Sequence, residues 1–136
     1  MMNADGSQPI QLTDNPAAQD QAPDWSPDGK QIVFQSDRDG HFELYVVIMS
    51  DLGEVVGLNR LTNTDCRSCT TQPRNLDPAW SPDGRYIAFD SDRDFAEEQI
   101  RQLFVMNADG SNQKSLTSLP GENGHAGWGW EADVEP

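Results

Sequence analysis

The stretch DPAWSPDGRYIAFDSDRD, residues 77–94, repeats an earlier stretch of the same chain, APDWSPDGKQIVFQSDRD, residues 22–39. When Pro23–Asp39 is placed over Pro78–Asp94, the offset is a constant 55 positions, and 12 of the 17 aligned residues are identical. A fixed internal period of this size is typical of repeat proteins, in which each repeat is one supersecondary unit. The sequence therefore predicts an array of similar units.

Two shorter phrases recur around this stretch, always in the same order. MNADGS occurs at residues 2–7 and 106–111, with a divergent version, MSDLGE, at 49–54. Leu-Thr follows each of them, at residues 12–13, 61–62 and 116–117. Each repeat therefore runs from the Pro-x-Trp-Ser-Pro-Asp-Gly phrase through Ser-Asp-Arg-Asp to a closing Leu-Thr.

Turn residues divide each repeat into short strands. Ser-Pro-Asp-Gly places proline and glycine where a type I turn favours them, so it predicts a hairpin. Ser-Asp-Arg-Asp and Asn-Ala-Asp-Gly are also turn-rich and lie between runs of β-branched and aromatic residues. These runs are too short for typical helices. They are residues 31–35, 42–48, 85–90 and 102–106.

The apolar runs predict sheets that are covered on both faces. IVF, IAF, LYVV and LFVM are apolar at adjacent positions, whereas a strand of a one-sided sheet alternates apolar and polar residues. Stacking one four-stranded antiparallel meander on the next covers both faces, as in the blades of a β-propeller. We therefore predict an all-β fold of propeller blades.

The phrases also set the predicted limits of the blades. Residues 22–62 and 78–117 form two complete blades, and residues 2–13, with Pro9–Thr13 as a surplus last strand, end a preceding one. Residues 118–136 begin a degenerate third blade, in which Ala132 and Val134 replace the proline and glycine of the turn phrase. The chain is then a piece of a longer propeller or a subunit that completes a ring with copies of itself.

The phrases MNADGS, PAWSPDGRYIAFDSDRD and LFVMNADGS resemble the WD-like repeat of TolB-type β-propellers, over roughly residues 2–131. The resemblance implies a periplasmic or extracellular protein that binds partner proteins without turning over a substrate. Related propellers serve as gating domains of serine peptidases or act as pectin-fragment lyases, so the resemblance alone does not fix the function.

The net charge of −14 limits the partners of the chain. It has the wrong sign for nucleic acid or an anionic membrane surface, so we expect neither as a partner. No apolar run is long enough to span a membrane, and the N-terminus lacks the basic and apolar regions of a signal peptide. We therefore expect no membrane insertion and no signal peptide in this chain.

We expect no catalysis, cofactor or metal. No Gly-x-Ser-x-Gly elbow occurs, and Ser26 and Ser81 recur because the turn requires them. His41 and His125 are not repeated and have no evident metal-ligating companions in the sequence. Trp25 and Trp80 recur at identical phase, so we expect both to pack on the inner strands rather than to bind a ligand.

Cys66 and Cys69 form a Cys-x-x-Cys pair in TDCRSCT. Such a pair can be a redox dithiol, half of a zinc site or a small-loop disulfide. The sequence offers neither a second zinc-ligand pair at zinc-finger spacing nor a βαβ context. A surface disulfide or two free thiols is therefore the favoured interpretation.

Strand parity predicts where a partner binds. In a meander, Ser-Asp-Arg-Asp and the two longest connections share one end of the blades, and variable loops on a repeated scaffold usually carry recognition. The predicted partner-binding residues are Asp37, Arg38, Asp39, Asp92, Arg93 and Asp94. An alternative assignment of these phrases to calcium loops lacks the required third acidic position and final glutamate. The repetition of Ser-Asp-Arg-Asp indicates a structural turn, in which the aspartates cap backbone N–H groups and the arginine pairs with a neighbour.

We therefore hypothesise a non-catalytic propeller scaffold that binds a protein or other ligand through its loop face and self-associates as a homo-oligomer to complete a ring. The alternative is the sensor or gating domain of a larger hydrolase or lyase.

Overall fold

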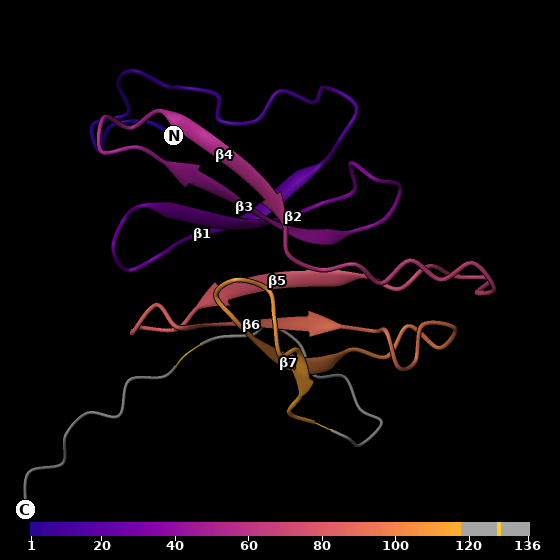
Figure 1. Cartoon of the computed structure of the whole chain (residues 1–136). Coiled ribbons are helices and arrows are strands. Elements are labelled where there is room, and N and C mark those ends of the chain that lie inside the picture. Colours follow the sequence, from indigo (N-terminus) through magenta and orange to yellow (C-terminus); the bar gives the residue numbers. More distant parts are fainter. Residues whose placement is uncertain (118–127, 129–136) are drawn as a thin grey trace, which may run out of the picture.

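A computed structural model describes residues 1–117 and Trp128, which form two four-stranded antiparallel meanders (Figure 1). The first sheet contains β1 (Asp20–Trp25), β2 (Gln31–Ser36), β3 (Glu43–Met49) and β4 (Val55–Arg60). The second contains β5 (Asn75–Trp80), β6 (Tyr86–Ser91), β7 (Gln102–Asn107) and β8 (Lys114–Ser115). The predicted all-β fold is confirmed, and the two sheets are consistent with propeller blades.

The turn between the first two strands of each sheet is fixed by Ser-Pro-Asp-Gly. The Ser26 hydroxyl donates to the Asp28 carboxylate over 2.6 Å, and the same carboxylate accepts the Lys30 N–H over 3.0 Å. Gly29 has φ +69°, a conformation that glycine adopts without a steric penalty. The second sheet repeats this arrangement with Ser81, Asp83, Gly84 and Arg85.

The first strand of each sheet contains a bulge next to its proline, which cannot donate a ladder hydrogen bond. Pairing of β1 with β2 shifts between Gln21 and Asp24, and Ala22 has φ +49°. In β5 the equivalent residue is Asp77, with φ +51°. Its N–H leaves the ladder and donates to Gln35 Oε1 of the first sheet over 2.7 Å. The bulge thus links one sheet to the next.

The two sheets stack face to face, and the main apolar core lies between them (Figure 1). The first sheet contributes Val33, Leu44 and Val46 to this core. The second contributes Trp80, Ile87, Phe89, Phe104 and Met106. Burial of each large apolar side chain contributes about 1.5–3 kcal/mol, so this interface dominates the stability of the pair.

A second apolar cluster lies on the other face of the first sheet and is covered by the N-terminal segment. It contains Ile32, Phe34, Tyr45, Val47 and Met49, with Leu12 packed against them. Leu61 packs in the same way against the main core. The Leu-Thr phrase therefore supplies the same apolar contact to both sheets.

The sequence predicts a strand at Pro9–Thr13, but the structure has none there. Ile10 instead pairs with the first residue: its N–H donates to the Met1 carbonyl over 2.7 Å, and the N-terminal ammonium of Met1 donates to the Ile10 carbonyl over 2.8 Å. The described residues contain no third strand of a preceding blade with which the segment could form a ladder.

The end of the second sheet is shorter than the sequence predicts. The strand leading to Leu116-Thr117 is reduced to Lys114 and Ser115. The predicted third blade, residues 118–136, lies outside the described residues except for Trp128, whose indole N–H donates to the Ala79 carbonyl over 3.0 Å. In the described part of the chain, no helix is long and apolar enough to cross a membrane.

The two repeated tryptophans differ in burial, although the sequence predicts that both pack inside the fold. Trp80 is 6% exposed because the first sheet covers it, whereas Trp25 is 44% exposed. The prediction is therefore right for Trp80 and wrong for Trp25. The reason is that no sheet lies in front of Trp25 among residues 1–117.

A comparison of Gly110→Ala with Gly6→Ala tests how firmly the β7–β8 turn is held against the first sheet. Both glycines occupy the MNADGS turn with similar φ, +86° and +83°, so both variants carry similar backbone strain. A Cβ at Gly110 would lie 2.7 Å from the Leu61 carbonyl oxygen, whereas nothing lies within 4 Å at Gly6. In urea denaturation, Gly110→Ala should lower the free energy of unfolding by at least about 1 kcal/mol more than Gly6→Ala. Equal losses would contradict the contact.

Candidate functional site

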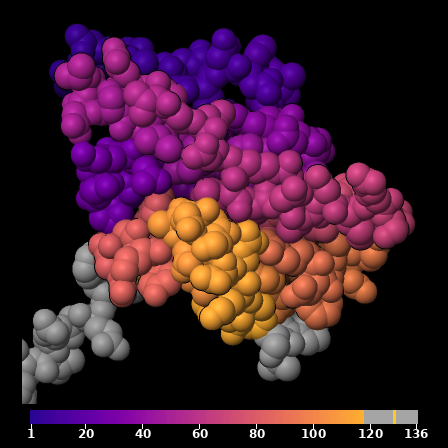
Figure 2. Space-filling view, in the orientation of Figure 1, coloured from indigo at the N-terminus to yellow at the C-terminus, as the bar shows by residue number. Residues whose placement is uncertain are grey.

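The connections of the sheets gather at two ends. Lys30 of the β1–β2 turn pairs with Asp51 of the β3–β4 turn over 2.9 Å, which places these two tight turns at one end. At the other end lie residues 37–42, residues 92–101 and the link between the sheets, residues 61–74. We call these three connections the loop rim. The link and the 92–101 connection project side by side (Figures 1 and 2).

Arg38, a predicted partner-binding residue, is held inside the first sheet. Its guanidinium lies 4.7 Å from the Tyr45 ring centroid and 5.2 Å from that of Phe34. It also donates to the Asp20 carboxylate over 3.0 Å and to the Ser36 hydroxyl over 3.0 Å. These contacts join β1, β2 and β3.

Arg93 repeats the arrangement in the second sheet. It lies 4.6 Å from the Phe104 ring centroid and 5.4 Å from that of Phe89. It donates to Asn75 Oδ1 over 2.6 Å and to the Ser91 hydroxyl over 3.0 Å. Burial lowers the pKa of Arg93, although the nearby carboxylates of Glu43 and Asp94 act to raise it, and the group stays cationic at neutral pH. Both arginines therefore stabilise the blades, as a structural turn phrase requires, and their part in partner binding stays a prediction.

The first aspartate of each Ser-Asp-Arg-Asp phrase holds the chain that enters the sheet. The Asp37 carboxylate accepts the Gln19 N–H over 2.7 Å. Asp92, which is buried, accepts the Arg74 N–H over 2.6 Å and its Nε–H over 2.9 Å. The repeated carboxylate thus satisfies a backbone donor that would otherwise lie unpaired at the start of the sheet. These contacts are the backbone capping expected of a structural turn, and the part of the two aspartates in partner binding stays a prediction.

The last aspartate of each phrase is exposed. Asp39 accepts the Tyr45 hydroxyl over 2.6 Å and lies 3.2 Å from Arg60. Burial and this hydrogen bond raise the pKa of Tyr45, so its hydroxyl stays protonated and donating. Of the six predicted partner-binding residues, Asp39 and Asp94 are therefore the two that the rim presents to solvent.

Glu43, at the start of β3, is the polar centre of the rim. Its carboxylate is fully buried and accepts hydrogen bonds from the Thr62 hydroxyl, the Thr64 N–H over 2.7 Å and Asn75 Nδ2 over 2.8 Å. Arg60 completes the set over 3.0 Å. Because the donors come from β4, β5 and the link, one carboxylate ties both sheets together.

The contacts of Glu43 keep it ionised. Burial by itself raises its pKa, but the hydrogen bonds from Thr62, Thr64 and Arg60 outweigh burial and hold the pKa below the ordinary value. The second sheet has the neutral counterpart Gln102, whose Oε1 accepts the Thr117 hydroxyl over 2.9 Å. The charged residue, Glu43, therefore stands in the first sheet, whose polar contacts reach the second sheet, and the neutral Gln102 stands in the second sheet.

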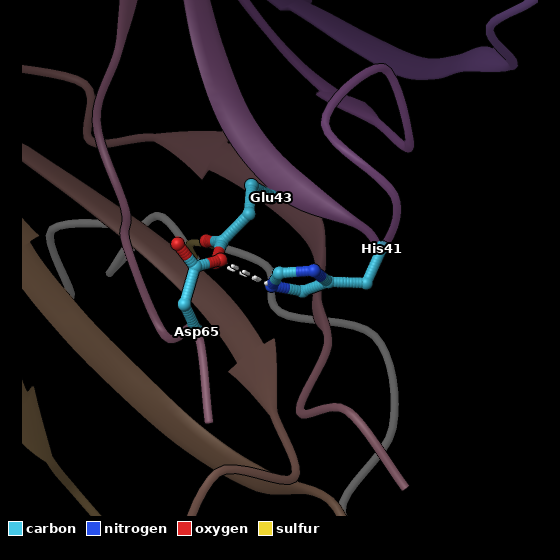
Figure 3. A group of neighbouring side chains, drawn as sticks. All are labelled: His41, Glu43 and Asp65. Carbon is cyan, nitrogen blue, oxygen red and sulfur yellow. Dashed lines mark hydrogen bonds and ion pairs between the residues drawn. The ribbon is translucent and has the colours of Figure 1, made fainter. Parts of the chain in front are cut away.

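His41 and Asp65 stand beside Glu43 (Figure 3). His41 Nε2 lies 3.0 Å from Glu43 Oε1 and 3.4 Å from Asp65 Oδ1. The sequence showed no companions for His41, and the structure supplies two. Such a trio resembles a metal-ligand set, but Arg60 Nη2 lies 3.0 Å from Glu43 and 3.3 Å from Asp65 and already provides the positive charge. We therefore assign the cluster to an ion-pair network.

The link between the sheets contains a disulfide that joins Cys66 and Cys69, with 5.4 Å between their Cα atoms. The side chain of Gln72 accepts the Cys66 N–H and donates to its carbonyl, over 3.1 and 2.7 Å. The Glu97 carboxylate accepts the Thr70 N–H over 2.9 Å. Residues 65–72 are thus tied to the 92–101 connection of the second sheet.

Comparison with known proteins gives relatives of the same type. The Tol-Pal system protein TolB of Anaeromyxobacter dehalogenans (strain 2CP-C) is 36% identical over 99 residues, which cover 73% of this chain and 19% of that protein. A solved TolB structure from Agrobacterium tumefaciens matches with a TM-score of 0.59 and 31% identity, covering 79% of this chain and 33% of the other. The chain is a TolB-like β-propeller region. No family profile matches it.

The TolB-like region also resembles propellers of hydrolases. It is 45% identical over 49 residues to the uncharacterized peptidase YuxL of Bacillus subtilis, covering 36% of this chain and 7% of YuxL. A puromycin hydrolase structure matches with a TM-score of 0.56 and 19% identity, over 71% of this chain and 14% of the hydrolase, and so shares the fold. The TolB-like region spans less than a third of the curated relatives it matches.

Glu43→Gln tests whether the buried carboxylate joins the sheets. The variant keeps the size but turns one acceptor into a donor that faces other donors, so the free energy of unfolding at pH 7 should fall by about 1–3 kcal/mol. Because the folded-state pKa of Glu43 is lowered, its ionic stabilisation is complete above the unfolded pKa of about 4.3 and is lost as pH falls through the folded pKa. The difference from wild type should therefore shrink between pH 5 and pH 3 in urea denaturation.

Asp65→Asn is the matched control, because it neutralises the cluster's other carboxylate at a side chain that is 56% exposed. It should change the free energy of unfolding by less than about 0.5 kcal/mol. If both variants lost equal stability, the central role of Glu43 would be wrong.

Proposed function

We propose that this TolB-like region is a non-catalytic scaffold that binds a protein partner through the loop rim, and that further blades complete its ring. The net charge of −14 favours a partner with a basic surface. Most of the proposed contact residues lie in the variable connections, and Asp94 of the second repeated phrase joins them.

One observation supports this proposal: at the rim, the repeated residues and the variable residues have different roles. The repeated residues are engaged within the chain: Arg38 and Arg93 with neighbouring strands, and Asp37 and Asp92 with the residue just before a strand. The exposed charge comes instead from residues that vary between the repeats: Asp65, Glu97 and Glu98. With Asp94 they give the rim four exposed carboxylates, against the exposed Arg67, on connections that are braced by hydrogen bonds and a disulfide. A surface held in place in this way binds with a smaller ordering cost than a free loop.

The relatives support a partner-binding role. The Anaeromyxobacter relatives are named as TolB proteins of the Tol-Pal system. We propose that the protein to which this region belongs acts likewise through protein contacts, in the periplasm or another extracellular compartment. A disulfide at Cys66 and Cys69 suits such an oxidising location.

A second candidate function is a sensor or gating domain of a larger hydrolase. The identity to YuxL, which is named as a peptidase, favours it. The reading frame that contains residues 1–136 distinguishes the two functions: a hydrolase domain encoded next to the propeller would favour gating, and additional propeller repeats without one would favour the scaffold.

Asp94→Asn/Glu98→Gln tests the acidic rim, with isolated Pal protein of the Tol-Pal system as the probe. Both side chains are exposed, so folding should be unaffected. Removal of two rim charges should weaken binding by at least about threefold and reduce its salt dependence, as measured by isothermal titration.

Asp51→Asn/Glu54→Gln is the control, because it removes the same charge from exposed residues of the β3–β4 turn at the opposite end. Its affinity should match wild type. Equal affinities for all three proteins would contradict the rim proposal, and a wild-type protein that does not bind Pal would rule out this partner.

A further inference from the structure

A pocket of about 180 Å³ lies between the two Ser-Pro-Asp-Gly turns. The first repeat lines it with Ser26, Pro27, Asp28 and Gln31, and the second with Trp80, Asp83 and Gly84. The turns are in contact, since a Cβ added to Gly84 would lie 3.6 Å from Cδ of Pro27. The packing of one sheet on the next therefore builds this pocket. It has room for a small organic group or for several waters.

Trp80 contributes an unpaired hydrogen-bond donor to the lining. Its side chain is 6% exposed, and its Nε1 atom is buried with no hydrogen-bond partner among residues 1–117 and Trp128. The backbone N–H of the same residue, by contrast, donates to Asp24 Oδ2 over 2.7 Å. Nearly all buried polar groups of folded proteins are paired, because an unpaired group loses its hydration without compensation. The indole N–H therefore indicates an occupant of the pocket that accepts a hydrogen bond.

The first repeat supplies acceptors to the same pocket. Asp28 accepts the Ser26 hydroxyl and the Lys30 N–H, and both hydrogen bonds end on Oδ1. Its other oxygen, Oδ2, takes part in neither bond and is available to a donor. The Gln31 side-chain amide, which can donate and accept, also lines the pocket. An occupant that satisfies this lining must therefore donate as well as accept.

The charge of the pocket selects among such occupants. Hydrogen bonds from the serine and the backbone of each turn hold the pKa of Asp28 below its ordinary value and lower that of Asp83 to about 2. Both carboxylates are therefore ionised at neutral pH and disfavour an anion. An ammonium group would suit the carboxylates, but it has no acceptor for the indole N–H. A neutral group that both donates and accepts suits the whole lining.

We propose that the pocket binds a small neutral ligand through a carboxamide group, whose oxygen accepts the Trp80 Nε1–H and whose NH₂ donates to Asp28 Oδ2. A carboxamide carries its acceptor and its donors on separate atoms, so one group can reach partners in both repeats. A single hydroxyl oxygen would have to lie within hydrogen-bond distance of all of them. The indole and the Pro27 ring supply the apolar part of the lining.

This site goes beyond the proposed partner binding and does not depend on it. The Ser-Pro-Asp-Gly turns lie at the tight-turn end of the sheets, and the loop rim lies at the other end. The rim variant Asp94→Asn/Glu98→Gln should therefore bind a carboxamide as the wild type does.

Three probes of the same shape test the hydrogen-bond pattern. Acetamide donates and accepts, acetate only accepts, and acetamidinium only donates. The indole N–H of Trp80 gives its own signal in a two-dimensional proton–nitrogen NMR spectrum of the full chain, and Trp80→Phe identifies this signal by its loss. Titration with acetamide should shift the signal to saturation. Acetate and acetamidinium should bind at least about tenfold more weakly, because each leaves a polar group of the lining unpaired.

Trp80→Phe also tests the donor itself, because it keeps an aromatic ring in the lining but removes the N–H. The backbone amide signal of Gly29, next to Asp28, reports binding in this variant, and its response to acetamide should be lost. Trp25→Phe is the matched control, since Trp25 has the same place in the first repeat and does not line this pocket. It should bind acetamide as the wild type does.

The wild-type titrations decide the inference even where a variant folds poorly. A Trp80 indole signal that acetamide does not move would overturn it, as expected if water alone fills the pocket. Equal responses to the three probes would also overturn it, because the lining would then not distinguish charge. A stronger response to glycerol than to acetamide would replace the carboxamide with a hydroxylated ligand and overturn the assignment.

Discussion

A four-stranded sheet with apolar residues on both faces cannot bury its core alone, and the whole structure follows from this constraint. Val33 and Phe34 are adjacent in β2 and lie in different clusters, one between the sheets and one under the N-terminal segment. Each sheet therefore needs a cover on both sides. The second sheet and the N-terminal segment cover the first sheet, and Trp25 marks the area that they leave uncovered.

Polar contacts decide how the sheets are arranged once apolar burial has brought them together. Dispersion and burial are non-directional, whereas the contacts of Arg38 with two rings and Asp20 fix the relative positions of three strands. Glu43 does the same between the sheets, because its donors Arg60 and Asn75 stand on the first and the second sheet. The cost of leaving such groups unpaired opposes any other register.

The repeat predicted the strands, the hairpin turns and the all-β fold, because local turn chemistry and apolar runs act over a few residues. Repetition of Ser-Asp-Arg-Asp indicated a structural turn, but it could not show which groups its charged residues contact. Arg38 and Asp92 belong to charged turn phrases that suggest exposure. In the structure, however, Arg38 lies over the Tyr45 ring, and Asp92 accepts the backbone N–H of Arg74. The contact of Glu43 with Asn75 spans 32 residues, so no local pattern could have revealed it. Repetition of such residues at identical phase was the available signal for a structural role.

The two repeats keep the same overall period although their loops differ in length. Tyr45 pairs with Arg60 in the first sheet, and its counterpart Phe104 pairs with Ser115, so the outer hairpin is four residues shorter in the second sheet. The β2–β3 connection gains the same number, since Phe34 pairs with Tyr45 and Phe89 pairs with Phe104. Compared with the first repeat, the second is thus shorter at the tight-turn end of the blade and longer by the same number of residues at the rim. Insertions at the rim can diversify recognition while the spacing between successive blades stays constant, which makes this rim a suitable place to graft foreign peptide loops.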